Sequence, residues 1–172
     1  MSPFRNMGGL DNEKRAITLV NLLREHGLTV ATAESLTGGL VSAVIVDVPG
    51  ASAVLRGAVV AYANEIKREV LGVDPELLAE HGAVNAATAG QMAIGIRRLM
   101  QADVGISTTG VAGPEPADGV EPGMAFVACS WAKEEPAIRA LKLEGSRAQV
   151  RTQVVTRALE LAEATIRQTT GI

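Results

Sequence analysis

With 172 residues, the chain has the length of one domain, and its net charge of −3 without a basic run argues against a nucleic-acid partner. The single cysteine excludes an internal disulfide and a cysteine-rich metal site. No apolar stretch approaches the roughly 18 residues that cross a membrane, and the first residues lack the apolar core of a signal peptide. We therefore expect a cytoplasmic globular protein with no membrane contact.

Helix caps, glycine stops and β-branched apolar runs predict that helices and strands interleave along the chain. Polar residues suited to N-caps open most of the helical segments (Asp11, Asn64, Asp74, Asn85 and Ser146). The expected helices span residues 11–26, 36–47, 65–71, 75–81, 86–100 and 147–168. The expected strands span residues 28–33, 53–63, 102–110, 124–131 and 137–145, and the last two are spaced like an antiparallel pair.

Interleaved strands and helices are typical of an α/β fold. We predict a layered α/β/α architecture with a mixed, partly antiparallel sheet. Aromatic residues are only 2% of the chain, so the core must consist of Val, Ile, Leu and Ala. No repeat or linker divides residues 11–172, which we expect to form a single domain after a flexible N-terminal segment, residues 1–10.

Neither histidine is a convincing catalytic base. His26 and His81 each stand near the end of a predicted helix, directly before a glycine, where the helix dipole favours a cation. This structural interpretation makes a Ser-His-Asp triad or a histidine metal site improbable. Cys129 lies in an apolar strand pattern and is expected to be a packed core residue.

Lys67 is the first candidate for a general base. If Asn64 caps the helix that follows, Lys67 occupies the third helical position, where an ammonium opposes the positive end of the dipole. That field and burial would lower its pKa toward neutrality, as a lysine base requires. An exposed surface lysine explains the position equally well. Tyr62, at a strand end, is either a hydrogen-bond donor into the same cleft or an ordinary strand-end aromatic.

Ser35 lies at a turn from a strand to a helix, at the sheet edge where α/β folds bind their ligands. Its hydroxyl could act as a nucleophile, but capping the helix explains it without any chemistry. The following amides, near Thr37 and Gly38, could hold an oxyanion or a phosphate. The spacing fits neither the S-x-x-K nor the G-x-S-x-G motif.

A second loop, residues 108–114, also follows a strand and could share that edge. Its glycines permit close approach to a ligand, although they do not match the dinucleotide-binding fingerprint. Arg147 and Arg151 lie one turn apart at the start of the final helix. Such a pair suits a carboxylate or phosphate, and a solvated helix face is an equal alternative.

Six stretches occur in an order known from one protein family: TAESLTGG, DVPGASAVLRGAVVAYANEIK, LGV, EHGAV, TTGVAGP and GSRAQVR. Together they resemble the C-terminal domain of CinA proteins. The resemblance covers residues 12–165. The N-terminal partner domain of full-length CinA is not recognisable, so we expect a stand-alone nicotinamide-nucleotide amidase of the PncC type.

The resemblance implies that nicotinamide mononucleotide is hydrolysed to nicotinic acid mononucleotide and ammonia. It implies a serine nucleophile and a lysine base, with no metal and no cofactor. The family's serine, tyrosine and lysine correspond to Ser35, Tyr62 and Lys67. On this interpretation Ser35 serves both as nucleophile and as helix cap.

The same resemblance suggests how the substrate is held. The implied partners are a small nucleotide and, in a homodimer, a second copy of the chain. The family's threonine-glycine loop corresponds to Thr109 and Gly110, and its glycine-aspartate-arginine motif ends at Arg147. With the amides after the serine, the expected substrate-binding set is Thr37, Gly38, Thr109, Gly110 and Arg147.

Three positions depart from the family pattern. Leu36 replaces a cysteine, Ser146 replaces the aspartate before Arg147, and residues 121–124 read EPGM where the family commonly has lysine-proline-valine-glycine. The last two bear on substrate binding more than on the serine and lysine. Two alternatives follow: a catalytically degenerate nucleotide-binding homologue, and a serine-lysine amidase for a different amide.

Overall fold

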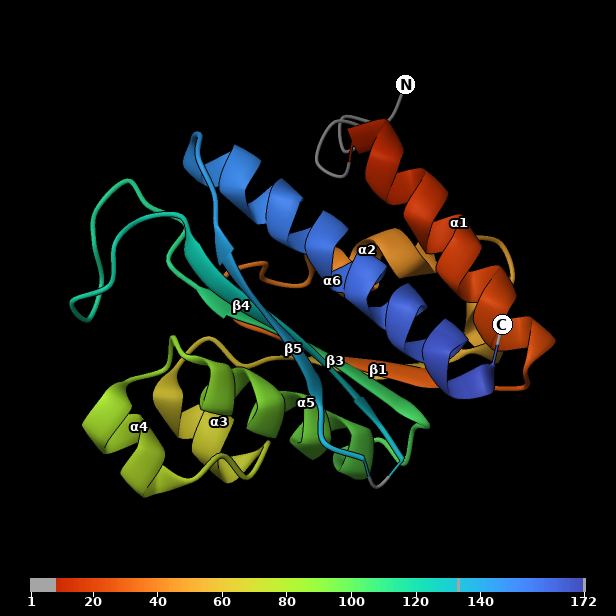
Figure 1. Cartoon of the computed structure of the whole chain (residues 1–172), viewed down its shortest axis with the longest axis horizontal. Helices are drawn as coiled ribbons and strands as arrows, with labels where there is room; N and C mark the ends of the chain where they lie inside the picture. Colours follow the sequence, from red (N-terminus) through yellow and green to blue (C-terminus); the bar gives the residue numbers. More distant parts are fainter. Residues whose placement is uncertain (1–8, 133, 172) are drawn as a thin grey trace.

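A five-stranded mixed sheet forms the centre of the computed structural model, which describes residues 9–132 and 134–171 (Figure 1). The strand order is β2-β1-β3-β4-β5, where β2, β1 and β3 are parallel and β4 and β5 run antiparallel to their neighbours. The strands are β1 (Val30–Glu34), β2 (Leu55–Val60), β3 (Val104–Gly110), β4 (Met124–Trp131) and β5 (Ala137–Lys142). The predicted α/β fold with a mixed sheet is confirmed.

Helices cover both faces of this sheet (Figure 1). On one face lie α1 (Gly9–Glu25), α2 (Leu40–Val46) and α6 (Arg147–Thr170). On the other lie α3 (Asn64–Glu69), α4 (Pro75–His81) and α5 (Ala86–Leu99). A single 3₁₀ turn, η1 (Ala51–Ala53), precedes β2. No helix of the described residues is long and apolar enough to cross a bilayer.

Three predicted N-caps are confirmed. Asp74 accepts from the Glu76 amide, Asn85 accepts from the Thr88 amide, and Ser146 forms a reciprocal capping box with Gln149. These side chains satisfy helical amides that would otherwise lack an acceptor.

Other predicted helix starts are wrong. Asn64 is the first residue of α3, whose cap position is Ala63, and α1 already begins at Gly9. Asp11 therefore lies within the first turn of α1, where it pairs with Arg15 at 3.1 Å. Of the N-terminal segment expected to be flexible, residues 1–8 lie outside the described residues, and the last two belong to α1.

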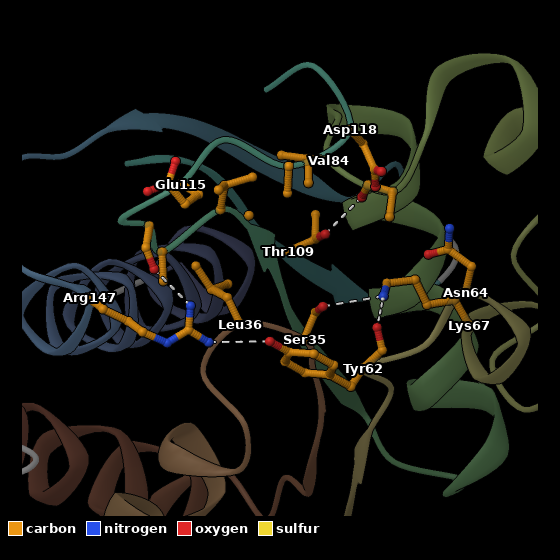
Figure 2. A pocket seen from close by; sticks show the side chains of 16 residues that line it. Ser35, Leu36, Tyr62, Asn64, Lys67, Val84, Thr109, Glu115, Asp118 and Arg147 are labelled. Atoms are coloured by element: carbon orange, nitrogen blue, oxygen red, sulfur yellow. Dashed lines mark hydrogen bonds between the residues drawn. The ribbon is translucent and has the colours of Figure 1, made fainter. Parts of the chain in front are cut away.

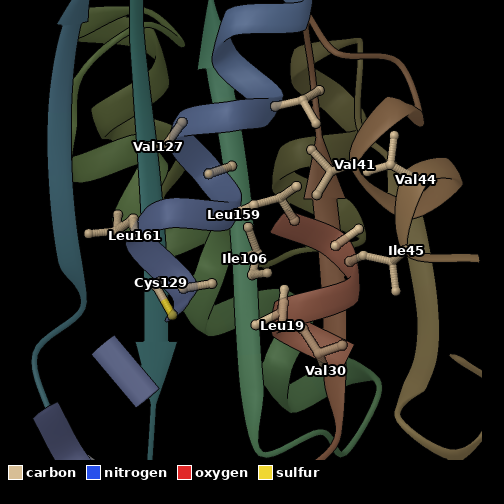
Figure 3. Packing of buried hydrophobic residues seen from close by; sticks show 14 of the residues in the cluster. Leu19, Val30, Val41, Val44, Ile45, Ile106, Val127, Cys129, Leu159 and Leu161 are labelled. Atoms are coloured by element: carbon tan, nitrogen blue, oxygen red, sulfur yellow. The ribbon is translucent and has the colours of Figure 1, made fainter. Parts of the chain in front are cut away.

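The main core lies between the sheet and the layer formed by α1, α2 and α6 (Figure 3). It is aliphatic, as the composition predicts, and Figure 3 shows Leu19, Ile45, Ile106 and Leu159 meeting over the central strands. Cys129 of β4 belongs to this core, and burial raises the pKa of its thiol to about 12. The predicted structural role of this cysteine is confirmed.

On the other face, α5 approaches β3 closely because glycine removes a side chain at the contact. A Cβ atom on Gly105 would lie 2.1 Å from the Ala93 carbonyl oxygen of α5. Such an overlap cannot be relieved by a rotamer change, since the obstructing atom is backbone. The spacing of α5 from the central strand therefore depends on this glycine.

We expect Gly105→Ala to lower the free energy of unfolding by about 3 kcal/mol, since overpacking against backbone forces the helix away from the sheet. Urea unfolding would measure the change. Gly90→Ala in α5 is the matched control, because its Cβ would meet side-chain atoms of Pro136 and Ile138, at 3.1 and 3.2 Å. Equal losses in the two variants would contradict this account.

Candidate active site

The carboxyl ends of the three parallel strands meet at one edge of the sheet. Glu34, the last residue of β1, pairs with Val60 on one side and Thr108 on the other, so the three strand ends are level. Ligands of α/β folds bind at this edge. A pocket opens here, and its lining includes six of the predicted site residues (Ser35, Tyr62, Lys67, Thr109, Gly110 and Arg147). Neither His26 nor His81 lines it.

Ser35 and Lys67 contact each other at the floor of this pocket (Figure 2). The Lys67 Nζ atom lies 3.2 Å from the Ser35 Oγ atom. Lys67 is 1% exposed and Ser35 is 8% exposed, so little water competes for this hydrogen bond. A serine hydroxyl beside a buried amine is the arrangement needed for a base to activate a nucleophile.

Burial lowers the pKa of Lys67 to about 8. Desolvation of the ammonium is the largest cause, and the carboxylates of Asp118 and Glu65 partly oppose it. The predicted lowering of the pKa is present; of its two predicted causes, burial is confirmed and the position at the helix start is wrong. Lys67 is the fourth residue of a six-residue helix and not the third, so burial, and not the helix start, supplies the shift.

Tyr62 touches Lys67 through its backbone. Its carbonyl oxygen accepts a hydrogen bond from Lys67 Nζ at 2.9 Å, whereas its phenol oxygen accepts one from Arg147 Nη2 at 3.3 Å. Figure 2 shows the phenol directed toward Arg147, away from the amine. The tyrosine ring, 62% exposed, therefore borders the pocket entrance while its main chain orients the lysine.

Ser35 does not cap α2, contrary to the sequence interpretation. The helix begins at Leu40 and is preceded by Gly39, which has no side-chain cap. The Glu34 carboxylate takes the capping role, since it accepts from the amides of Gly39, Val41 and Ser42 at 2.8–3.0 Å. The Ser35 hydroxyl is thus left for the contact with Lys67.

Thr37 and Gly38 do not line the pocket. The Thr37 hydroxyl is fully buried against Glu34, at 2.7 Å, and the Gly38 amide donates to the Ser35 carbonyl at 3.1 Å. In contrast, the backbone amides of Leu36 and Thr37 donate no hydrogen bond to any described residue. Only Leu36 of these two lines the pocket, so an oxyanion stabilised by this turn would meet the Leu36 amide.

The two arginines of α6 have different roles. Arg147 lines the pocket, and its Nη1 atom donates to the Gly113 carbonyl at 2.9 Å. Arg151 is directed to the turn after β1, where it donates to the carbonyls of Leu36 and Thr37 at 2.9 and 3.0 Å. Arg147 is therefore placed to meet an anionic ligand, whereas Arg151 supports the backbone.

Thr109 and Gly110 form the wall that β3 contributes. The Thr109 hydroxyl donates to the Ala83 carbonyl at 2.7 Å, so it offers only lone pairs to another group. A Cβ on Gly110 would lie 2.5 Å from the Ala125 Cβ, so the glycine here is required by packing against β4. Both residues line the pocket.

Comparison with known proteins identifies the family. The model of the CinA C-terminal domain matches residues 12–166. The chain belongs to the CinA C-terminal domain family. It is 45% identical over 147 residues to a putative competence-damage inducible protein of Halalkalibacterium halodurans, covering 86% of this chain and 35% of that protein. A CinA-like protein of Frankia casuarinae is 43% identical over 154 residues, which cover 90% of this chain and 35% of that protein.

Solved CinA structures share the fold. The competence/damage inducible protein CihA from Agrobacterium tumefaciens superposes with a TM-score of 0.88 at 33% identity, covering 95% of this chain and 98% of that one. A CinA superfamily protein from Klebsiella pneumoniae has a TM-score of 0.87 at 29% identity, with 91% and 98% covered. The chain spans about a third of the length of the curated relatives it matches.

Several residues of this CinA C-terminal domain site were not predicted. Glu115 and Asp118, on the loop between β3 and β4, add two carboxylates to the pocket lining. Glu34 was not predicted because a glutamate at the end of a strand is usually exposed, whereas Glu34 is fully buried. Its position directly before Ser35 and five residues before a glycine-led helix was the available signal.

The lowered pKa of Lys67 predicts a change of stability with pH. Between about pH 8 and 10.5 the unfolded chain binds a proton that folded Lys67 has released, so the free energy of unfolding rises with pH. The lowered pKa of Lys67 corresponds to a rise of about 3 kcal/mol in the free energy of unfolding across this range. Urea unfolding across this range should show the rise in the native chain and in Lys14→Met, an exposed-lysine control, but not in Lys67→Met. An identical rise in all three would refute the shift.

Proposed function

We propose that this domain hydrolyses the carboxamide of nicotinamide mononucleotide to nicotinic acid mononucleotide and ammonia. The observation that carries the proposal is the 3.2 Å contact between Ser35 and a buried lysine whose pKa is lowered to about 8. A hydroxyl paired with an amine that loses its proton near neutral pH suits acyl transfer. The substrate follows from the family resemblance of the motifs around these two residues.

In the acylation step, neutral Lys67 accepts the Ser35 proton while Oγ bonds to the carboxamide carbon. The carbonyl electron pair moves to oxygen, where the free amide of Leu36, a residue of the pocket lining, donates to it; such a donor is commonly worth about 3 kcal/mol. The Lys67 ammonium then protonates the amide nitrogen. The carbon–nitrogen bond breaks, ammonia leaves, and a nicotinoyl ester remains on Ser35.

In the deacylation step, water attacks the ester carbon and gives its proton to Lys67. The bond to Oγ breaks, and Lys67 returns the proton to the serine. Throughout, the Tyr62 carbonyl holds one N–H of Lys67 at 2.9 Å. This restraint leaves the amine lone pair free to point at Ser35.

The phosphate of the nucleotide is assigned to Arg147. Its guanidinium is the cation at the pocket rim, fixed by the Gly113 carbonyl and the Tyr62 phenol. The Ser146 departure leaves the start of α6 intact, since Ser146 forms a capping box. The Glu121 departure lies outside the pocket lining. Both departures are therefore compatible with substrate binding.

We expect the purified protein to release ammonia and nicotinic acid mononucleotide from nicotinamide mononucleotide in equal amounts, with a chelator present. Ser35→Ala and Lys67→Ala should each lower kcat by about a thousandfold or more, since each removes a member of the acylating pair. Ammonia would be measured by a coupled assay and the acid by chromatography.

His81→Ala serves as the control, because His81 lies outside the pocket, and it should retain native turnover. Undiminished activity in Ser35→Ala would disprove the serine mechanism. Binding of the nucleotide without ammonia release by the native protein would identify a degenerate homologue. Turnover of another amide alone would retain the chemistry but replace the substrate.

Arg147→Gln should raise KM for nicotinamide mononucleotide by about thirtyfold, because it removes a charge-assisted contact to the phosphate. Hydrolysis of nicotinamide riboside, which lacks the phosphate, should change little. Steady-state kinetics on both substrates would test this. An equal loss on both would show that Arg147 acts on the reacting end or on the fold instead.

A further inference from the structure

Asp118 adds a negative charge to the wall of the pocket that contains Ser35 and Lys67. It lies on the loop between β3 and β4 and belongs to the pocket lining. Burial lowers the pKa of Lys67, and the Asp118 carboxylate is the largest of the charges that oppose this lowering. One charge acts on another only at short range, since salt screens exposed charges beyond about 10 Å. Asp118 therefore lies near the reacting end of the pocket.

A tight turn fixes the backbone of Asp118. Ala117 and Val120 exchange two backbone hydrogen bonds, at 2.9 and 3.1 Å, which close a two-residue hairpin turn. The turn residues are Asp118 and Gly119, and both have positive φ, 52° and 74°, as a type I′ turn requires. Asp-Gly is a preferred sequence for that turn. The exposed carboxylate is therefore presented to the pocket by a defined backbone.

Each side of the pocket carries one cationic side chain and one carboxylate (Figure 2). Arg147 and Glu115 lie on one side of Ser35 in this view, and Lys67 and Asp118 lie on the other. The Asp118 carboxylate forms no hydrogen bond or ion pair with another described residue. A Lys67 that acts as a base must be neutral, which leaves the charge of Asp118 uncompensated. In that state the reacting end favours a ligand with a positive charge.

The substrate proposed above carries such a charge next to its reacting group. The ring nitrogen of nicotinamide mononucleotide is bonded to ribose, so the pyridinium ring is a cation at every pH. A single ring carbon separates this nitrogen from the carbon that bears the carboxamide. When the carboxamide reaches Ser35, the ring charge must therefore lie at the end of the pocket that holds Lys67 and Asp118.

Resting on the function proposed above, we propose that Asp118 is a specificity-determining residue, which selects amides of a cationic, N-substituted pyridinium ring over uncharged amides. Its carboxylate attracts the ring charge, while Arg147 takes the phosphate on the other side of the pocket. Free nicotinamide has a neutral ring and no phosphate, so it gains neither contact. The selection operates in binding, and Asp118 is not a member of the acylating pair.

The test measures binding to Ser35→Ala, which prevents turnover, at about pH 9, where Lys67 is mostly neutral. The ligands are nicotinamide mononucleotide and its 1,4-dihydro form, which share the carboxamide, ribose and phosphate but differ in the charge of the ring. Asp118→Asn, added to this background, removes the carboxylate and keeps the turn, because Asn-Gly is also preferred in type I′ turns.

We expect Asp118→Asn to raise the Kd of nicotinamide mononucleotide by roughly fivefold, the upper end for an exposed ion pair. The Kd of the dihydro form should change by less than about twofold, because its ring offers no charge to the carboxylate. Isothermal titration calorimetry would give both values, and thermal unfolding would be recorded for each variant.

Glu65→Gln is the matched control, because the Glu65 carboxylate also acts on Lys67 but does not line the pocket. In the Ser35→Ala background it should leave the ratio of the two Kd values unchanged. Glu121→Gln removes a carboxylate of the same loop as Asp118 that lies outside the pocket lining, and it should also leave the ratio unchanged.

An unchanged ratio in Asp118→Asn would overturn the proposal. An equal loss for both ligands would overturn it as well, since Asp118 would then only support the loop. The same would follow from an equal change in Glu65→Gln, because the effect would then come from the field around Lys67. If the native protein releases no ammonia, yet Asp118→Asn still loses its preference for the charged ring, only the proposed hydrolysis fails. If neither ligand binds, both proposals fall.

Discussion

The buried carboxylate of Glu34 is the interaction on which the site depends. Five donors converge on it: the hydroxyls of Thr32 and Thr37 and three amides at the start of α2. A fully buried charge is costly unless hydrogen bonds compensate it, and here they come from a strand, a turn and a helix. Thr108 extends the network to β3 through Thr37, at 2.8 Å. Hydrogen bonds therefore join the end of β1 to the turn after it, to the start of α2 and to β3.

This network explains why Ser35 can line the pocket although it stands just before α2: the helix does not need its hydroxyl as a cap. Because Glu34 supplies the acceptors that α2 needs, the residue after it is free to face the pocket. Lys67 lies on α3, the short helix that follows β2 and packs on the opposite face of the sheet from α2. It is only 1% exposed. The same burial that removes water from its contact with Ser35 also lowers its pKa.

Much of this arrangement was predictable from the sequence, for identifiable reasons. The strands and most helices follow from apolar periodicity and local caps, and the pocket-lining serine, lysine and arginine lie in motifs that resemble one family. Contacts between groups remote in the chain are harder to predict. Nothing local indicates that Arg151 reaches carbonyls 115 and 114 residues away, and the sequence leaves a buried and an exposed Lys67 as equal alternatives. The predicted cap at Asn64 failed because α3 begins at Asn64 itself, and the one at Ser35 failed because the Glu34 carboxylate accepts from the amides at the start of α2.

The backbone carbonyl and the side chain of Tyr62 have separate roles. Its carbonyl orients the lysine whatever side chain the position carries, whereas its ring and phenol reach only the entrance and Arg147. Exchanges at this position would leave the main-chain restraint on Lys67 in place while reshaping the opening of the pocket. Ligand preference in this scaffold can therefore diverge through a single side chain without disturbing the contact between Lys67 and Ser35 behind it.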